Sequence, residues 1–213
     1  MALIINRFHL IIFLFLLSLI SCSTANDEKV EFQRSIPLEG QVNFRDLGNY
    51  DTESGRKIVT GMVYRSGTLA KISDLDKKVL DSLGIKTVIN FLDEGERNKF
   101  GEDRLPEGVK NILLPIEGQN NEAATLLEAR QTGDFSKVPV DFNYQIHAQL
   151  IEEGKEAYAE MFHILADSSN YPMVFHCSHG VHRTGTASAL ILSSLGVPWE
   201  TVQEDYLLSN DCR

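Results

Sequence analysis

The stretch from Val174 to Gly185 reads Val-Phe-His-Cys-Ser-His-Gly-Val-His-Arg-Thr-Gly. It joins an apolar, strand-like segment to a segment with helical apolar spacing through a short loop. In such a loop successive backbone N–H groups point toward one spot, and the helix N-terminus adds partial positive charge there. Gly180 lets the backbone turn where a side chain would intrude. The stretch therefore predicts a cradle for a tetrahedral dianion.

The residue types in this loop suit nucleophilic chemistry. A thiol has a pKa of about 8.5, which a helix N-terminus and a nearby cation lower, so Cys177 is the expected nucleophile. Arg183 is expected to fork two oxygens of the anion, and Thr184 to donate its hydroxyl to the thiolate. His176 is expected to orient the loop from behind. The anion contacts are expected from Ser178, His179, Gly180, Val181, His182 and Arg183. The alternative is a buried structural cysteine beside a core strand.

Strand-like and helical segments alternate through the rest of the chain. Short apolar or β-branched runs predict strands at 58–64, 87–92, 109–114 and 173–175. Helical patterns lie at 73–83, opened by a capping box of Ser73 and Asp76, at 158–165, and from about Arg183 to Gly196. This alternation predicts an α/β three-layer sandwich around a mainly parallel central sheet. Residues 118–154 fit the rhythm less well and are expected to form a helical insertion.

The first residues form a separate apolar segment. The uncharged run from Leu10 to Ile20 is shorter than the roughly 20 apolar residues of a membrane span and suits a secretory signal. Cys22 stands where this run stops, which resembles the lipobox of bacterial lipoproteins; the alternative is an ordinary signal peptide. We expect a signal peptide at 1–21, lipidation of Cys22, a polar tether at 22–37 and one domain at 38–213.

Composition limits the possible partners. The chain has 213 residues and a formal net charge of −10, which argues against nucleic-acid binding through surface charge. It has no Cys/His spacing typical of a metal site, so neither a metal nor another cofactor is expected. After cleavage before Cys22, the remaining cysteines outside the lipidation site are Cys177 and Cys212. A bridge between these two would silence Cys177, and the sequence leaves that open.

The loop is similar to the His-Cys-x5-Arg-Thr/Ser signature of the protein-tyrosine phosphatase superfamily. Four further segments, 43–50, 63–67, 83–89 and 205–210, resemble the bacterial tyrosine/serine and lipid phosphatase branch, starting with its Asn-Phe-Arg-Asp motif. The resemblance covers about residues 38–212 and implies a cysteine-phosphatase-like fold. It implies that Arg65 and Ser66 lie near the phosphate loop. Arg45 and Asp46 are interpreted as a pair that ties down the N-terminal segment.

The chain departs from that branch at two places. The branch usually has Lys-Asp before the loop arginine, where this chain has Val181 and His182. The branch also has an acidic Asp at the position matching Gly118, whereas this chain has Glu117 one residue earlier. Glu117 is expected to protonate the leaving group, with Asp93 as the second candidate and a solvated loop carboxylate as the structural alternative for Glu117.

These features support three hypotheses of function. The first is an exported, lipid-anchored bacterial enzyme, periplasmic or on the cell surface, that hydrolyses phosphotyrosine or phosphoserine through a phosphocysteine intermediate. The second keeps this chemistry with inositol phosphates or phosphoinositides as substrates. The third is a phosphate-binding module without turnover.

Overall fold

The computed structural model describes residues 32–117, 128–129 and 131–212. The described residues from Gln33 onward belong to one compact unit. The predicted signal peptide, Cys22 and the tether up to residue 31 lie outside the described residues, as do residues 118–127 of the predicted insertion.

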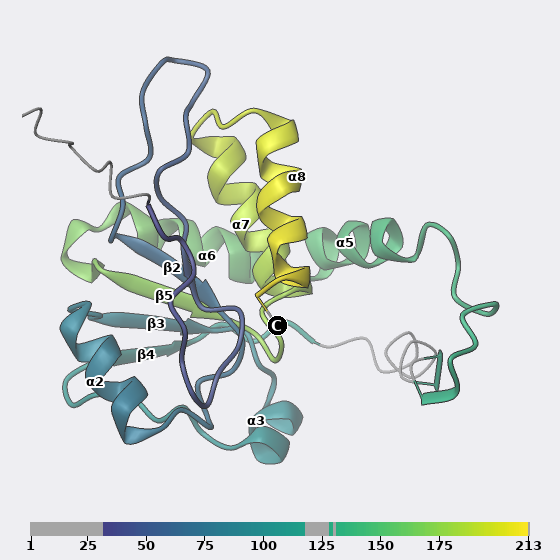
Figure 1. The fold of residues 1–213 in the computed structure, drawn as a ribbon, viewed down its shortest axis with the longest axis horizontal. Helices are drawn as coiled ribbons and strands as arrows, with labels where there is room; N and C mark the ends of the chain where they lie inside the picture. The colour runs from purple at the N-terminus through teal and green to yellow at the C-terminus, as the bar shows by residue number, and fades with distance from the viewer. Residues whose placement is uncertain (1–31, 118–127, 130, 213) are drawn as a thin grey trace, which may run out of the picture. The chain divides into compact units, whose positions relative to one another are not determined.

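A five-stranded sheet forms the centre of the unit (Figure 1). Its strand order is β1-β2-β5-β3-β4, and only the β1–β2 pair is antiparallel. The strands are β1 (Arg45–Asp46), β2 (Val63–Ser66), β3 (Thr87–Asn90), β4 (Lys110–Leu113) and β5 (Met173–His176). The mainly parallel sheet is confirmed. Because β5 lies between β2 and β3, the loop that follows it leaves from the middle of the sheet's carboxyl edge.

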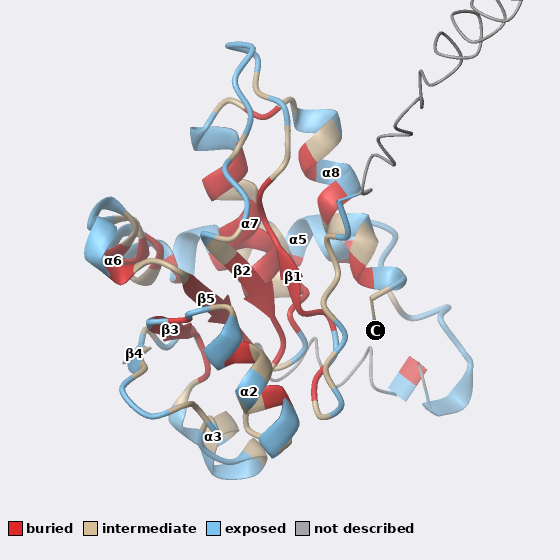
Figure 2. Ribbon diagram, turned by 60° about the vertical axis from the view of Figure 1, so that its left-hand side comes forward, coloured by how far each residue is buried: buried red, intermediate tan, exposed pale blue. Residues whose placement is uncertain are grey.

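Two hydrophobic clusters cover the two faces of the sheet. Successive side chains of a strand point to opposite faces. Val88 and Val174 therefore pack with Leu80 of α2 (Asp74–Ser82) on one face. Ile89 and Phe175 pack on the other face with the apolar residues of α6 (Lys155–Ala166) and α7 (His182–Ser194). Figure 2 shows the buried sheet between these layers, which confirms the three-layer sandwich.

The predicted strand at 58–64 is wrong in its bounds. The strand begins only at Val63. Gly61 has a φ of 75°, and its N–H donates to the Asp46 carboxylate at 2.7 Å, so the backbone turns just before β2. The preceding residues form a hairpin in which Asp51 bridges Lys57. The apolar pair at residues 58 and 59 therefore belongs to this hairpin.

Three helices, α2, α6 and α7, agree with the predicted patterns. Ser73 and Asp76 form the expected capping box at the start of α2. Sequence patterns did not predict α3 (Glu94–Phe100) or α8 (Trp199–Leu207), whereas α5 (Phe142–Glu153) falls in the predicted insertion. Short 3-10 turns, η1 (Ser168–Asn170) and η2 (Leu208–Asn210), complete the elements. Within the described ranges, no helix has the length and apolar composition needed to cross a membrane.

The folded unit begins earlier than the expected boundary at residue 38. Ser35 forms a bridge with Arg45, and the Arg34 guanidinium donates to the carbonyls of Asp46 and Gly48 at 2.7 and 2.6 Å. Residues 34–36 therefore run beside β1 and are not tether. The sequence pattern did not predict this pairing because the segment is polar. Backbone pairing at a sheet edge requires no apolar side chains.

Candidate active site

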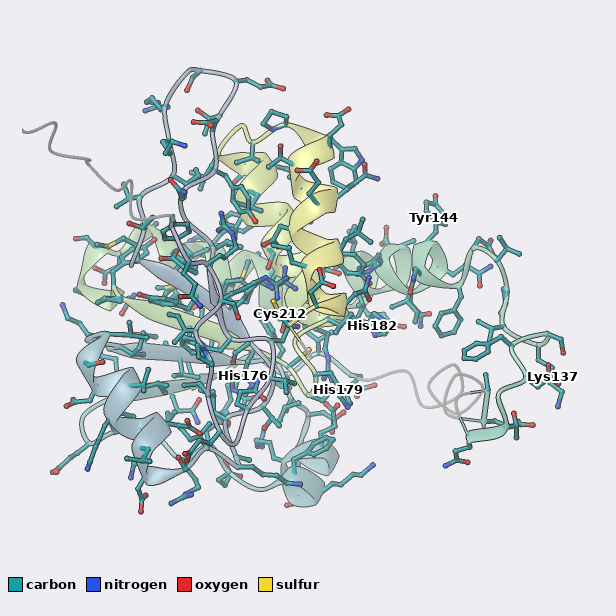
Figure 3. The ribbon with its side chains drawn as sticks, viewed as in Figure 1. Lys137, Tyr144, His176, His179, His182 and Cys212 are labelled. Atoms are coloured by element: carbon teal, nitrogen blue, oxygen red, sulfur yellow. The ribbon has the colours of Figure 1, made fainter. Side chains whose placement is uncertain are left out.

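The loop from Cys177 to Val181 connects β5 directly to α7, as predicted. Figure 3 shows His176, His179 and His182 gathered at this junction, one each from strand, loop and helix. Gly180 has a φ of 70°, which turns the loop back toward the helix. In the described part of the chain, the backbone N–H groups of Ser178, Gly180 and Val181 donate to no backbone oxygen. They are available to an anion.

Side chains from two segments hold this loop from behind. The carbonyl of Gly180 accepts from Asn43 Nδ2 at 2.8 Å and from Arg65 Nη2 at 2.9 Å. A Cβ at Gly180 would lie 2.7 Å from backbone atoms of Ser66 and Gly67, so no larger residue fits without displacement. Arg65 and Ser66 thus lie behind the loop, which is the position that the family resemblance implies.

The Cys177 thiol lies at the base of the loop and is 2% exposed. Burial alone raises the pKa of a thiol. The Arg183 charge, the Thr184 hydroxyl and the backbone N–H groups of Thr184 and His179 outweigh burial, so the pKa of Cys177 is lowered below its usual value. The geometry therefore favours a thiolate.

Arg183 is held by a carboxylate and two backbone carbonyls. Its guanidinium pairs with both oxygens of Glu96, each at 2.5 Å, and donates to the carbonyls of Phe91 and Ile116 at 3.0 Å. Burial tends to lower the pKa of Arg183, but the hydrogen bonds to Glu96 and the negative charges of Cys177 and Glu96 outweigh it and raise this pKa. Glu96 was missed in the sequence because it lies 87 positions from Arg183.

His176 is fully buried and acts on the loop through its ring. Its Nε2 contacts Asp103 Oδ2 at 3.0 Å, and its Nδ1 lies 3.3 Å from the carbonyl of Cys177. Asn90 also donates to Asp103 at 2.7 Å. His176 is thus fixed behind the nucleophile, and its partner Asp103 carried no signal in the sequence.

The two other loop histidines have different surroundings. His179 is exposed, with its ring edge against Phe100 at 6.4 Å and its Nδ1 3.1 Å from Ser178 Oγ. His182 is half-buried and packs against the ring of His147 from α5, with ring centres 5.9 Å apart. The part of the loop at His182 therefore contacts the insertion.

The two candidate proton donors lie near Arg183 in different settings. Asp93 caps α3, where its Oδ1 accepts from the Glu96 N–H at 2.8 Å. Glu117 is exposed and directly follows Ile116, whose carbonyl accepts from Arg183. Asp93 has a structural partner in its own helix, whereas Glu117 stands on a chain segment bonded to the loop arginine.

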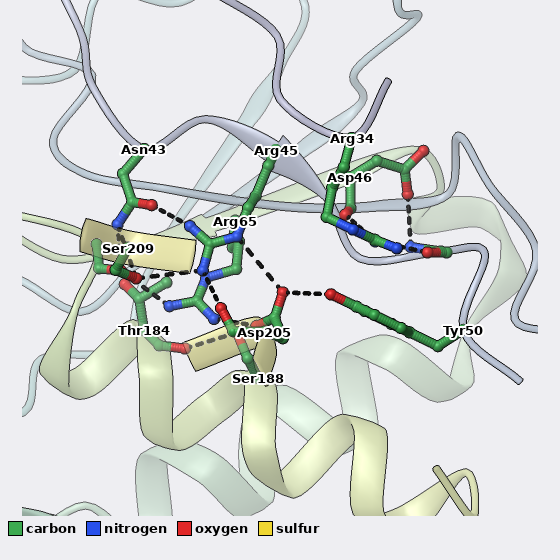
Figure 4. Close-up of polar contacts among 12 residues, drawn as sticks. Arg34, Asn43, Arg45, Asp46, Tyr50, Arg65, Thr184, Ser188, Asp205 and Ser209 are labelled. Atoms are coloured by element: carbon green, nitrogen blue, oxygen red, sulfur yellow. Dashed lines mark hydrogen bonds and ion pairs between the residues drawn. The ribbon is translucent and has the colours of Figure 1, made fainter. Parts of the chain in front are cut away.

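Arg45 and Asp46 do not form the expected pair. Neighbouring strand residues point to opposite sides. Arg45 bonds Asp205 and Asn43, whereas Asp46 accepts the N–H groups of Gly48 and Gly61 at 2.7 Å. Figure 4 shows Arg45, Arg65, Tyr50 and Asp205 in one buried network. Both cations pair with the Asp205 carboxylate, Arg65 Nη1 at 2.5 Å and Arg45 Nε at 3.4 Å.

The described residues hold neither a disulfide nor a cluster suited to a metal ion. Cys177 and Cys212 are both free thiols, so no bridge blocks the candidate nucleophile. Among the residues described, no group of three or more His, Cys, Asp or Glu side chains is arranged to hold a metal ion.

Two proteins named as phosphatases resemble this chain in sequence. A protein of Cupriavidus necator that carries the name of a tyrosine-protein phosphatase is 29% identical over 181 residues, which cover 85% of this chain and 65% of that protein. The triple specificity protein phosphatase PtpB of Mycobacterium tuberculosis is 26% identical over 195 residues, 82% of this chain and 68% of that protein. This chain thus spans about two thirds of the length of these relatives.

The chain also resembles a solved structure and matches a family model. The core catalytic domain of the PP-IP phosphatase SIW14 of S. cerevisiae is 17% identical, with 82% of this chain and 77% of that chain covered and a TM-score of 0.45. The model of the tyrosine phosphatase family matches residues 36–213. This match includes the strand–loop–helix junction and nearly all of the described residues. The chain belongs to the tyrosine phosphatase family.

Proposed function

We propose that the chain is a cysteine-dependent phosphatase that hydrolyses phosphomonoesters of proteins. The observation that carries this proposal is the buried Cys177 thiol of lowered pKa beneath a turn of unpaired N–H groups, with the Arg183 guanidinium beside it. A thiolate is the reactive form of cysteine, and amides and a guanidinium stabilise the charge of a phosphoryl group in transfer.

The reaction has two steps. The Cys177 sulfur attacks phosphorus, an S–P bond forms, and the P–O bond to the alcohol breaks while that oxygen takes a proton from Glu117. Water then attacks phosphorus and gives its proton to the Glu117 carboxylate. The S–P bond breaks, and inorganic phosphate leaves with the thiolate restored. The Thr184 hydroxyl stabilises the sulfur as it departs.

Glu117 is the proposed acid because its side chain has no structural task in the described unit, whereas Asp93 caps α3. Ile116 and Arg183 are bonded at 3.0 Å, which brings the backbone next to Glu117 to the phosphate loop. The related branch has an Asp at the position of Gly118. Glu117 lies one residue earlier, but its side chain is one methylene longer and can reach the leaving oxygen.

Phosphotyrosine and phosphoserine are the proposed substrate class. The M. tuberculosis relative is named a triple specificity protein phosphatase, which supports a range of phosphate esters for this chain too. Inositol phosphates are the alternative, motivated by the exposed His179 at the mouth of the loop. Turnover of a phosphotyrosine peptide, a phosphoserine peptide and an inositol polyphosphate on one enzyme preparation separates them. Equal or faster inositol turnover contradicts the protein-phosphatase assignment.

The basic activity is tested with an aryl phosphate. Cys177→Ser abolishes turnover, and the control Cys212→Ser retains it because Cys212 is not the proposed nucleophile. Binding of a phosphopeptide to the wild-type protein without any hydrolysis identifies a binding module and overturns the proposal.

We further propose that the mature protein is exported and held at a membrane through a lipid on Cys22. The apolar run that ends at Cys22 supports this. Expression of the full chain in bacteria with labelled fatty acid tests it. Label that is lost in Cys22→Ala supports the anchor, and an unlabelled wild-type protein contradicts it.

A further inference from the structure

A line of hydrogen bonds joins α5 and α6 to the first turn of α7. His147 Nδ1 of α5 lies 2.7 Å from Thr186 Oγ1 of α7. The Thr186 hydroxyl also acts on the phenol of Tyr158 from α6 as a hydrogen-bond donor that tends to lower the phenol pKa. The Tyr158 hydroxyl in turn lies 3.2 Å from the carbonyl oxygen of Arg183. The line ends on the backbone of the residue that is proposed to bind phosphate.

The donors in this line run in one direction only. A carbonyl oxygen accepts and never donates, so Tyr158 donates to Arg183. Tyr158 then accepts from Thr186, whose single proton is used, and Thr186 accepts from Nδ1–H of His147. Burial followed by the Arg65 charge lowers the pKa of His147, which keeps the ring neutral with one proton. Within the described residues its other nitrogen, Nε2, has no partner, as expected for the unprotonated one.

The Tyr158 hydroxyl is placed to act on the nucleophile through the backbone. Tyr158 is 3% exposed, and burial raises its pKa, with the nearby Cys177 charge adding to the rise. The phenol therefore stays protonated and remains a donor. The Arg183 carbonyl that it binds directly precedes Thr184, whose hydroxyl and N–H both stabilise the Cys177 thiolate.

The aromatic ring of Tyr158 supports the same region. It packs edge-on against Phe91, with ring centres 5.7 Å apart, and the Phe91 carbonyl accepts from the Arg183 guanidinium at 3.0 Å. Tyr158 thus supports Arg183 in two ways. Its hydroxyl binds the Arg183 carbonyl, and its ring packs on Phe91, whose carbonyl binds the Arg183 guanidinium.

We propose that Tyr158, supported by Thr186 and His147, is a positioning residue that fixes the first turn of α7 against Cys177. The inference rests on the proposed function, because the group that it positions is the proposed nucleophile. It assigns a task at the site to α5 and α6: α5 supports the start of α7 from the segment that the sequence marks as an insertion.

The test compares Tyr158→Phe with Tyr171→Phe. Tyr171 makes the same kind of bond, from its hydroxyl to the Leu165 carbonyl at 2.5 Å, but without contact to the loop. One hydrogen bond contributes about 0.5–1.5 kcal/mol, so we expect Tyr158→Phe to lower kcat about threefold to tenfold with KM nearly unchanged. The thiol pKa, followed through alkylation of the Cys177 peptide against pH, should rise by about half a unit. Tyr171→Phe should change neither quantity.

A rescue pair extends the test to His147. Asparagine can place an amide donor near the position of Nδ1, so His147→Asn should keep most of the activity, whereas His147→Leu should resemble Tyr158→Phe. Thr186→Val combined with Tyr158→Phe should lower kcat little more than either change alone, because both substitutions break the same line of hydrogen bonds.

Two results overturn the inference. One is a Tyr158→Phe protein with the wild-type thiol pKa and kcat. The other is an equal loss in Tyr158→Phe and Tyr171→Phe, which indicates a general packing effect. The alkylation readout requires no turnover, so an inactive wild-type protein contradicts the proposed function while leaving the positioning of Cys177 open to measurement.

Discussion

Thr184→Val removes the hydroxyl beside the Cys177 sulfur and keeps the shape of the buried side chain. The Thr184 side chain is fully buried and is one of the groups that lower the pKa of Cys177. A hydrogen bond to a charged group contributes about 1.5–3 kcal/mol. Since one pKa unit corresponds to about 1.4 kcal/mol, its loss should raise the thiol pKa by about one to two units.

The sign of the effect on activity follows from the reactive form. The thiolate is present only above the thiol pKa, so a raised pKa shifts the acid limb of kcat/KM to higher pH by the same amount. Arg183 and the two backbone N–H groups remain, so the pKa should stay below that of an unassisted buried thiol. The departing sulfur also loses a donor, so kcat should fall even at high pH.

The assay is the rate of iodoacetamide alkylation of Cys177 across pH, read by mass spectrometry of its peptide, beside the pH profile of kcat/KM. Thr184→Ser is the matched control, because serine keeps the donor and loses only a methyl group. An unchanged thiol pKa in Thr184→Val, or the same rise in Thr184→Ser, refutes the reasoning.

Asp205→Asn should destabilise the fold by about 3–5 kcal/mol, measured by urea unfolding, because it leaves two buried guanidinium groups without their carboxylate. Burial raises the pKa of Asp205, but the charges of Arg65 and Arg45 outweigh it and lower this pKa, so wild-type stability is expected to fall as pH drops through the folded value and not as pH rises. Gly180→Ala places a Cβ 2.7 Å from backbone at a φ of 70°, so both the melting temperature and turnover should fall; an active, equally stable variant contradicts the loop geometry. Glu117→Gln should lower kcat for an alkyl phosphate more than for a nitrophenyl phosphate, whose leaving group needs no proton, whereas Asp93→Asn should act mainly on stability through α3.

The loop and its flanking elements could be predicted from the sequence because their determinants are local. A strand pattern, a glycine at the turn and a helical apolar stripe all lie within the stretch that contains Cys177 and Arg183. The capping box at Ser73 is local in the same way, and the structure has it. The bounds of β2 were not predicted, because Gly61 turns through a bond to Asp46, which is distant in sequence.

The partners of the site residues could not be predicted for the same reason. Glu96, Asp103 and Asp205 reach Arg183, His176 and Arg65 across 87, 73 and 140 positions of chain. An acidic side chain in a helix or loop gives no sign of which buried cation it meets in the fold. The start of α3 did carry a local signal, since Asp93 and Glu96 have capping-box spacing. Pro198 is a local signal of the same kind, since it stands at the N-cap of α8.

The most direct measurement is a rapid acid quench of the full chain during turnover of an aryl phosphate, followed by mass spectrometry of its cysteine peptides. The account predicts one phosphoryl group on the Cys177 peptide, which accumulates further in Glu117→Gln if that residue also activates the water, and none on the Cys212 peptide. Turnover with no phosphoryl group on Cys177, together with activity retained in Cys177→Ser, contradicts it.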